Sequence, residues 1–224
     1  MSLFSPEYLG KGQIYYANGV DTLYEYQQGS CQFLSKLAGG SDIHYSYNPT
    51  NGLALDVARC YTEKFGFIPP YMAVASCATG IQFAKPYQSI ASQAYVEQWT
   101  RFHEQAGPND KLLQICHSEA TMQIKIGLEN SPPEVRNRII VLAIAPSEFI
   151  SKTKCFDVQH YVSHDFIPYT DFRGFARARE EGTVTFLTPV PGAVALFDHS
   201  FRSPTYRPAL EKHIENFTKA YQVD

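Results

Sequence analysis

The chain has 224 residues, of which 44% are hydrophobic and 18% are charged. These are globular proportions, and the length suits one well-buried core, so we predict a single domain over residues 1–224. A formal net charge of −3, with scattered Lys and Arg residues, excludes the basic surface by which proteins bind nucleic acid.

Strand and helix patterns alternate along the chain. Apolar or β-rich runs at 13–17, 43–47, 112–117, 139–145, 156–162 and 183–187 predict six strands. Apolar residues at helical spacing predict helices from Thr22 to the glycine pair at 39 and 40, over 53–65, over 95–106, directly after Ser118, and over 210–221. This order predicts an α/β fold with a mainly parallel six-stranded sheet and helices on both faces.

Ser118 lies at the corner between the 112–117 strand and the helix that follows it. A serine at such a corner stands clear of the sheet, and amides at the start of the helix point toward negative charge forming beside it. The usual nucleophile elbow is Gly-x-Ser-x-Gly, and here Cys116 and Ala120 replace the glycines with other small residues. We predict that Ser118 is a nucleophile, and the alternative is a surface serine that caps an ordinary helix.

Two further candidates follow later strands. Asp165 comes just after the 156–162 strand, and His199 comes after the last strand and a Pro- and Gly-rich loop. Ligands bind beyond the carboxyl ends of strands in such a sheet, and a nucleophilic serine needs a base oriented by a carboxylate. We therefore predict the catalytic set Ser118, His199 and Asp165, with Asp171 as the alternative acid.

Nearby ionisable residues fit these roles less well. Neighbouring side chains in extended backbone point to opposite sides, which argues against Asp198 as the acid and His117 as the base. His160 and His164 have the spacing of a metal-binding pair, but the sequence offers no third ligand beside them. We expect no metal and no cofactor.

Acyl transfer also needs two N–H donors for the oxyanion. The amide of Glu119, directly after the nucleophile, supplies the first. The second is expected from Gly19 or Val20, which follow the first strand, because a glycine there lets the backbone approach the substrate closely. A plain turn is the alternative for this segment.

The elbow and the order serine, acid, histidine resemble the α/β-hydrolase superfamily of lipases and esterases, over about residues 13–221. The segments 16–19, 37–40, 143–146 and 197–206 are also similar to a chlamydial protein family of unknown function, from whose His-Ser-Gln-Gly elbow this chain departs at 119 and 120. The first resemblance implies a serine hydrolase that cleaves a small acyl ester, from a lipid or another compound, through an acyl-enzyme.

Two other functions stay open. One is a non-catalytic binding or host-interaction module built on the hydrolase fold, and the other is an acyltransferase that uses the same residues. The superfamily often carries a lid, for which the apolar segment 66–86 is the candidate, although a folded loop would account for it equally. Within this segment, the apolar stretch 71–84 is too short to cross a membrane, and nothing in the sequence indicates membrane contact.

The cysteines and the N-terminal residues indicate the cellular compartment in which the protein is expected. Five widely spaced cysteines with no Cys-x-x-Cys pair favour free thiols over a disulfide framework. No signal peptide is visible at the start of the chain. We expect a cytoplasmic protein, with secretion into a host as the alternative.

Overall fold

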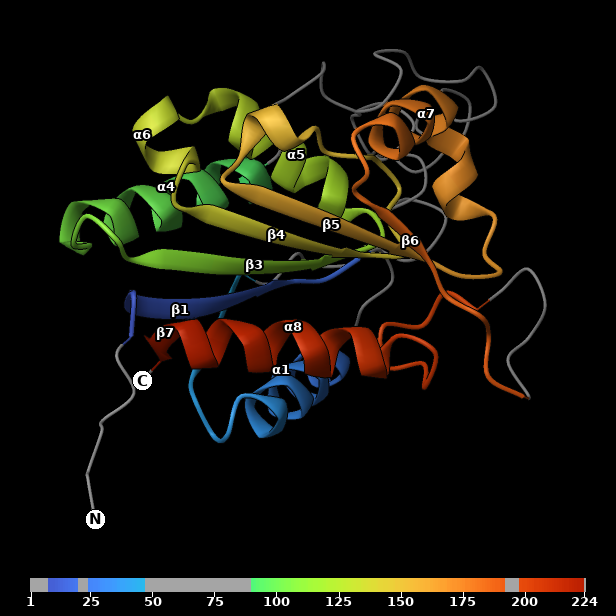
Figure 1. Cartoon of the computed structure of the whole chain (residues 1–224), viewed down its shortest axis with the longest axis horizontal. Coiled ribbons are helices and arrows are strands. Elements are labelled where there is room, and N and C mark those ends of the chain that lie inside the picture. The colour runs from blue at the N-terminus through green and yellow to red at the C-terminus, as the bar shows by residue number, and fades with distance from the viewer. Residues whose placement is uncertain (1–7, 20–23, 47–89, 192–197, 224) are drawn as a thin grey trace, which may run out of the picture.

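The computed structural model describes residues 8–19, 24–46, 90–191 and 198–223, which form a parallel sheet covered by helices (Figure 1). The strands are β1 Gly10–Ala17, β2 Ile43–Ser46, β3 Lys111–His117, β4 Ile139–Ile144, β5 Asp157–Val162, β6 Val184–Phe186 and β7 Tyr221–Val223. The helices are α1 Tyr24–Leu37, α4 Ile90–Gln105, α5 Ala120–Asn130, α6 Pro133–Arg136, α7 Phe172–Glu180 and α8 Arg207–Ala220, with 3₁₀ turns η1 Lys152–Lys154 and η2 Ile167–Asp171.

The strand order determines where a ligand can bind. The strands lie in the order β2-β1-β3-β4-β5-β6, with β7 beside the start of β1, and all the pairings among the described strands are parallel. The chain goes from β1 to β2 on one side and returns to β3 on the other, so the winding reverses between β1 and β3. The carboxyl ends of two strands that flank such a reversal are the usual binding position in an open α/β sheet. Gly19 follows β1 there, and Ser118 follows β3.

Two large hydrophobic cores hold α1, α8, α4 and α5 against the sheet, and a smaller cluster of Phe149, Val162 and Ala178 holds α7. Side chains alternate along β1, so that Ile14 and Tyr16 belong to the core under α1 and α8, whereas Tyr15 and Ala17 belong to the core under α4 and α5. Figure 1 shows these helix pairs on opposite faces of the sheet. Burial on both faces explains why the central strands are apolar nearly throughout.

The predicted fold class is confirmed: an α/β fold with a mainly parallel sheet and helices on both faces. All six predicted strands are present among the described residues. Three details differ: Tyr221 begins a seventh strand instead of ending the last helix, and the sequence pattern predicts neither α6 nor α7. The predicted helix 53–65 and the lid candidate 66–86 lie outside the described residues, and the single domain stays a prediction.

The described cysteines, Cys31, Cys116 and Cys155, are free thiols. In the described ranges, no helix combines the length and the apolar composition that crossing a bilayer requires.

Candidate active site

The turn at Ser118 has the geometry of a strained elbow. Ser118 has a φ of 56°, a left-handed conformation that costs a non-glycine residue about 1–3 kcal/mol. Its N–H donates to the carbonyl of Ile144 at 3.1 Å, which ties the corner to the end of β4. The flanking Cys116 and Ala120 are completely buried, so no space remains for larger side chains at these two positions.

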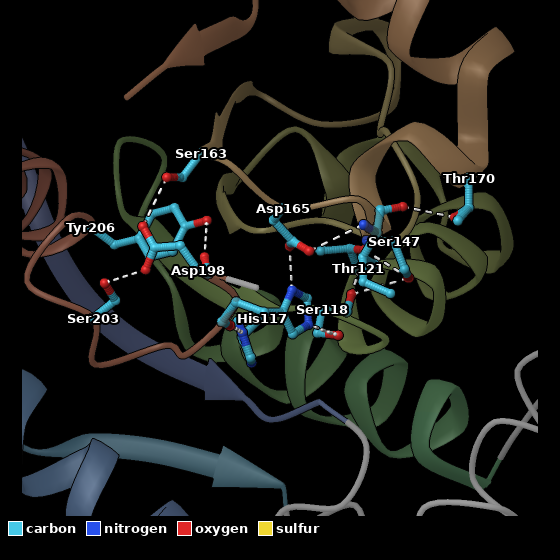
Figure 2. A network of polar contacts seen from close by, with 12 residues as sticks. His117, Ser118, Thr121, Ser147, Ser163, Asp165, Thr170, Asp198, Ser203 and Tyr206 are labelled. Atoms are coloured by element: carbon cyan, nitrogen blue, oxygen red, sulfur yellow. Dashed lines mark hydrogen bonds and ion pairs between the residues drawn. The ribbon is translucent and has the colours of Figure 1, made fainter. Parts of the chain in front are cut away.

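The backbone carbonyl of Ser118 is held by two side chains (Figure 2). The hydroxyl of Thr121 donates to it at 2.7 Å, and the hydroxyl of Ser147 donates at 3.1 Å. The oxygen of Thr121 also accepts the N–H groups of Ser147 and Glu148, at 3.0 and 3.1 Å. These bonds connect the elbow to the loop after β4 and offset the strain at Ser118.

The structure brings the three predicted catalytic side chains together. The imidazole of His199 lies between two partners: Nε2 accepts the Ser118 hydroxyl, with 2.7 Å between Nε2 and Oγ, and Nδ1–H donates to Oδ2 of Asp165. Asp165 is buried, and its Oδ1 accepts the N–H of Ile167 at 3.1 Å, which fixes the carboxylate. Figure 2 shows Asp165 and Ser118 at the two ends of this chain of hydrogen bonds.

His117 supports the base from the other side, a role that sequence reasoning did not find. Its Nε2–H donates to the backbone carbonyl of His199 at 2.6 Å, and the two rings lie 4.9 Å apart. Burial, with a smaller contribution from the neighbouring His199, lowers the pKa of His117 to about 3. The ring therefore stays neutral at physiological pH and fastens the loop that carries the base.

Asp198 anchors that loop and does not contact the imidazole of His199 within the described network. Its carboxylate accepts the hydroxyls of Ser163 at 2.8 Å and Ser203 at 2.6 Å, and its carbonyl accepts the hydroxyl of Tyr206. Burial raises the pKa of the Asp198 carboxyl, but the hydroxyl donors outweigh burial and lower it overall. Both carboxylate oxygens of the adjacent acid are therefore used to hold this loop.

The alternative acid, Asp171, is placed elsewhere. Its carboxylate accepts the N–H of Gly174 at 3.1 Å and so caps the start of α7. The other oxygen accepts the N–H of Phe149 at 3.0 Å. Both oxygens are used within the packing of α7, so the choice between Asp165 and Asp171 falls on Asp165.

His160 and His164, which have the spacing of a metal-binding pair, do not face a common point. His160 is buried, with its Nε2 accepting the N–H of Ile150 and its Nδ1–H donating to the carbonyl of Thr183, whereas His164 is exposed. Among the described residues no group of three or more His, Cys, Asp or Glu side chains could hold a metal ion.

Buried His160 makes stability depend on pH. Burial lowers its pKa to about 4, so below pH ~6.5 the unfolded chain binds a proton that the folded protein does not. The free energy of unfolding is therefore expected to fall as the pH falls from 6.5 toward 4, and His160 alone accounts for about 2 kcal/mol of the loss between pH 7 and 5. Urea unfolding at the two pH values measures this.

His160→Gln should show a pH dependence smaller by about 2 kcal/mol, while His164→Gln, at an exposed position, should behave as the unaltered protein does. An unchanged pH dependence in His160→Gln would disagree with the burial of a neutral imidazole.

Gly19 lies against Ser118 on the side of β1. A Cβ added at Gly19 would lie 2.8 Å from Cβ of Ser118, closer than such atoms pack, and 3.2 Å from the carbonyl oxygen of His117, a tight contact. Glu119, the other predicted oxyanion donor, follows Ser118 directly at the start of α5, and its buried carboxylate accepts the side-chain amide of Gln123 at 3.4 Å. Val20 lies outside the described residues.

We expect Gly19→Ala to lower the kcat/KM of any reaction that uses Ser118 by about 10²-fold, because the added methyl displaces the Ser118 side chain. Gly107→Ala is the matched control, since its added Cβ would meet Asp110 at an ordinary 3.4 Å on the loop before β3. Steady-state kinetics of both variants compare them, and equal activities would mean that Ser118 tolerates a side chain at position 19.

Comparisons with known proteins add a family and a distant structural likeness. The family described as "Protein of unknown function (DUF687)" matches residues 73–220. Among solved structures, a novel cutinase-like protein from Cryptococcus sp. is 10% identical, with a TM-score of 0.39, and the alignment covers 94% of this chain and 91% of that chain. No curated protein matches. A structural likeness of this size says nothing about the residues of the site, and the chlamydial resemblance stays a prediction.

Proposed function

We propose that this chain, which belongs to the family described as "Protein of unknown function (DUF687)", is a serine hydrolase of carboxylic esters. The observation that supports the proposal is the hydrogen-bond chain from Asp165 through His199 to a serine in left-handed conformation at a strand-to-helix turn. Each of these residues has a common structural use on its own, whereas nucleophilic catalysis needs all three in this geometry.

The reaction starts with proton transfer to the base. His199 Nε2 takes the Ser118 hydroxyl proton while Oγ attacks the ester carbonyl carbon, and Asp165 keeps the Nδ1–H tautomer and stabilises the imidazolium that forms. The tetrahedral oxyanion then forms beside the first turn of α5. The Glu119 amide and an amide of Gly19 or Val20 are the proposed donors to it, and the positive end of the helix adds to their effect.

Collapse of the intermediate breaks the bond to the alcohol. The imidazolium of His199 returns its proton to the leaving alkoxide, and the acyl group stays on Ser118 Oγ. Water then attacks the acyl-enzyme with His199 as the base again, which releases the carboxylic acid and restores the hydroxyl. The proton that restores the Ser118 hydroxyl comes from this water and passes through His199.

Turnover of p-nitrophenyl esters of increasing acyl length tests the proposal. We expect saturable release of p-nitrophenol, with kcat on the order of 1 s⁻¹ or more for the preferred chain length. Release no faster than in buffer at every chain length would favour the alternative of a binding module on a hydrolase fold.

A further inference from the structure

A row of exposed aromatic side chains begins one residue after Asp165. Phe166, Tyr169 and Phe172 are three residues apart, on and beside the 3₁₀ turn η2, where side chains at this spacing lie on one face. The ring of Phe175 connects the row to β6, because it contacts the rings of Tyr169 and Phe186, with centroids 5.4 and 5.8 Å apart. We call Phe166, Tyr169, Phe172 and Phe186 the aromatic face.

These four side chains are unusually exposed. Their exposed fractions are 49% for Phe166, 50% for Tyr169, 68% for Phe172 and 53% for Phe186. Single exposed hydrophobic residues are ordinary on a soluble protein, but a connected group of rings marks a surface that binds something apolar. Of the four phenylalanines that are exposed among the described residues, three belong to this face and Phe156 does not.

The fold does not need the outward rings. Helix α7 is held by its opposite side, where Gly174 and Ala178 are buried and Phe175 contacts Phe149 with ring centroids 5.4 Å apart. Polar residues at Tyr169 or Phe172 would leave that contact intact. The aromatic face is therefore available for an external partner.

Basic side chains accompany the rings. The guanidinium of Arg173 lies 5.7 Å from the ring centroid of Phe172, and that of Arg179 lies 5.8 Å from the ring centroid of Phe175. Among the nearby acids, Asp171 caps α7, and Glu181 accepts the hydroxyl of Ser151 and the N–H of Lys152.

The balance of charge on this helix is positive. Within α7, three arginines stand against the one exposed acid, Glu180, although the whole chain carries a formal net charge of −3. Arg177 donates to the carbonyl of Phe149 and lies near Glu181. Arg173 lies beside Phe172 of the aromatic face, and Arg179 lies beside Phe175, which contacts two rings of that face.

We propose that the aromatic face binds the surface of an anionic lipid membrane. Rings enter the boundary between head groups and acyl chains, while arginine stems lie along them and keep their charge at the phosphates. Figure 1 shows α7 at the end of the sheet toward which the strands point, the end that carries the Ser118 elbow. Docking would bring that end to the membrane and would deliver a lipid ester to Ser118. This delivery rests on the proposed function, whereas the membrane binding does not.

Flotation with vesicles tests the binding, using the Ser118→Ala protein so that no lipid is turned over. We expect it to float with vesicles of phosphatidylcholine and phosphatidylserine. Tyr169→Ser combined with Phe172→Ser should lower the partition coefficient about tenfold or more, since two rings leave the lipid. Phe156→Ser is the matched control, because this ring is 54% exposed and also lies near a cation, Lys111, but precedes β5 at the other end of the strand.

A second pair of changes tests the role of charge. Arg173→Gln combined with Arg179→Gln should lower partition onto the anionic vesicles by about tenfold and leave binding to pure phosphatidylcholine as it was. Equal binding by all variants, equal loss in Phe156→Ser, or no flotation of the Ser118→Ala protein would overturn the proposal. A dimer in sedimentation that the Tyr169 and Phe172 changes dissociate would also overturn it, since the face would then join copies of the chain. Vesicle binding by a protein that hydrolyses no ester would overturn the proposed function alone.

Discussion

Replacing Ser118 by alanine is expected to lower kcat for an ester by about 10⁴-fold or more, as removal of a nucleophile does in serine hydrolases. The change removes one oxygen at a buried position and leaves the backbone bonds from Thr121 and to Ile144 in place. Folding should be little affected. Steady-state kinetics with a p-nitrophenyl ester measure the loss, and circular dichroism confirms the fold.

Ser200→Ala is the matched control for this change, because Ser200 follows His199 directly and is exposed. It should keep kcat within about twofold, as surface substitutions away from the chemistry do. If Ser118→Ala kept most of the activity, the hydrolysis would come from another residue, and the account of the elbow would be wrong.

Asp165→Asn is expected to lower kcat by about 10⁴-fold while His199 stays in place. An amide at this position can donate to Nδ1, which favours the tautomer with the proton on Nε2. That tautomer cannot accept the Ser118 proton. Kinetics for the Asn variant should therefore lose kcat at nearly constant KM.

Asp171→Asn separates the two acids between which the sequence left a choice. Asn also caps helices well, so the variant should keep its fold and keep kcat within about threefold. The opposite pattern, with Asp171→Asn inactive and Asp165→Asn active, would contradict the hydrogen bond between Asp165 and His199 that the structure contains.

The elements that could be predicted from sequence are those with large apolar side chains. The strands β3 and β4 are apolar on both faces because helices cover both faces, and this pattern is visible without a structure. The positions of Ser118, Asp165 and His199 after their strands follow from the order of the elements. A parallel sheet brings the carboxyl ends of its strands to one edge, which is why residues 34 and 81 positions apart meet at one imidazole.

Helix α7 could not be predicted in the same way, because its buried positions are Gly174 and Ala178. Periodicity is read from large apolar residues, and the large ones here, such as Phe172, point outward. The seventh strand was missed for a related reason. Tyr221 continues the apolar spacing of α8, and only its pairing with Gly10 at the start of β1 makes it a strand.

The hydrogen bonds that support the Ser118 turn could not be predicted from the sequence either. Thr121 and Ser147 hold the same carbonyl, but 26 residues separate them and neither has an apolar or charged pattern that marks it. His117 was set aside as a base, which agrees with the placement of His199 between Ser118 and Asp165. His117 instead donates to the backbone carbonyl of His199. This contact depends on the position of the loop that carries His199, which the residue spacing does not indicate.

The most direct test of the account is the position of a covalent label. A fluorophosphonate reacts with a serine activated by a histidine, and cleavage with trypsin after Lys111 and Lys125 gives a peptide in which Ser118 is the one serine. We predict that mass spectrometry finds the phosphonate on Ser118 of the unaltered protein and finds no label in His199→Ala. Labelling at another residue, or equal labelling of the Ser118→Ala protein, would contradict the assignment of Ser118 as the nucleophile.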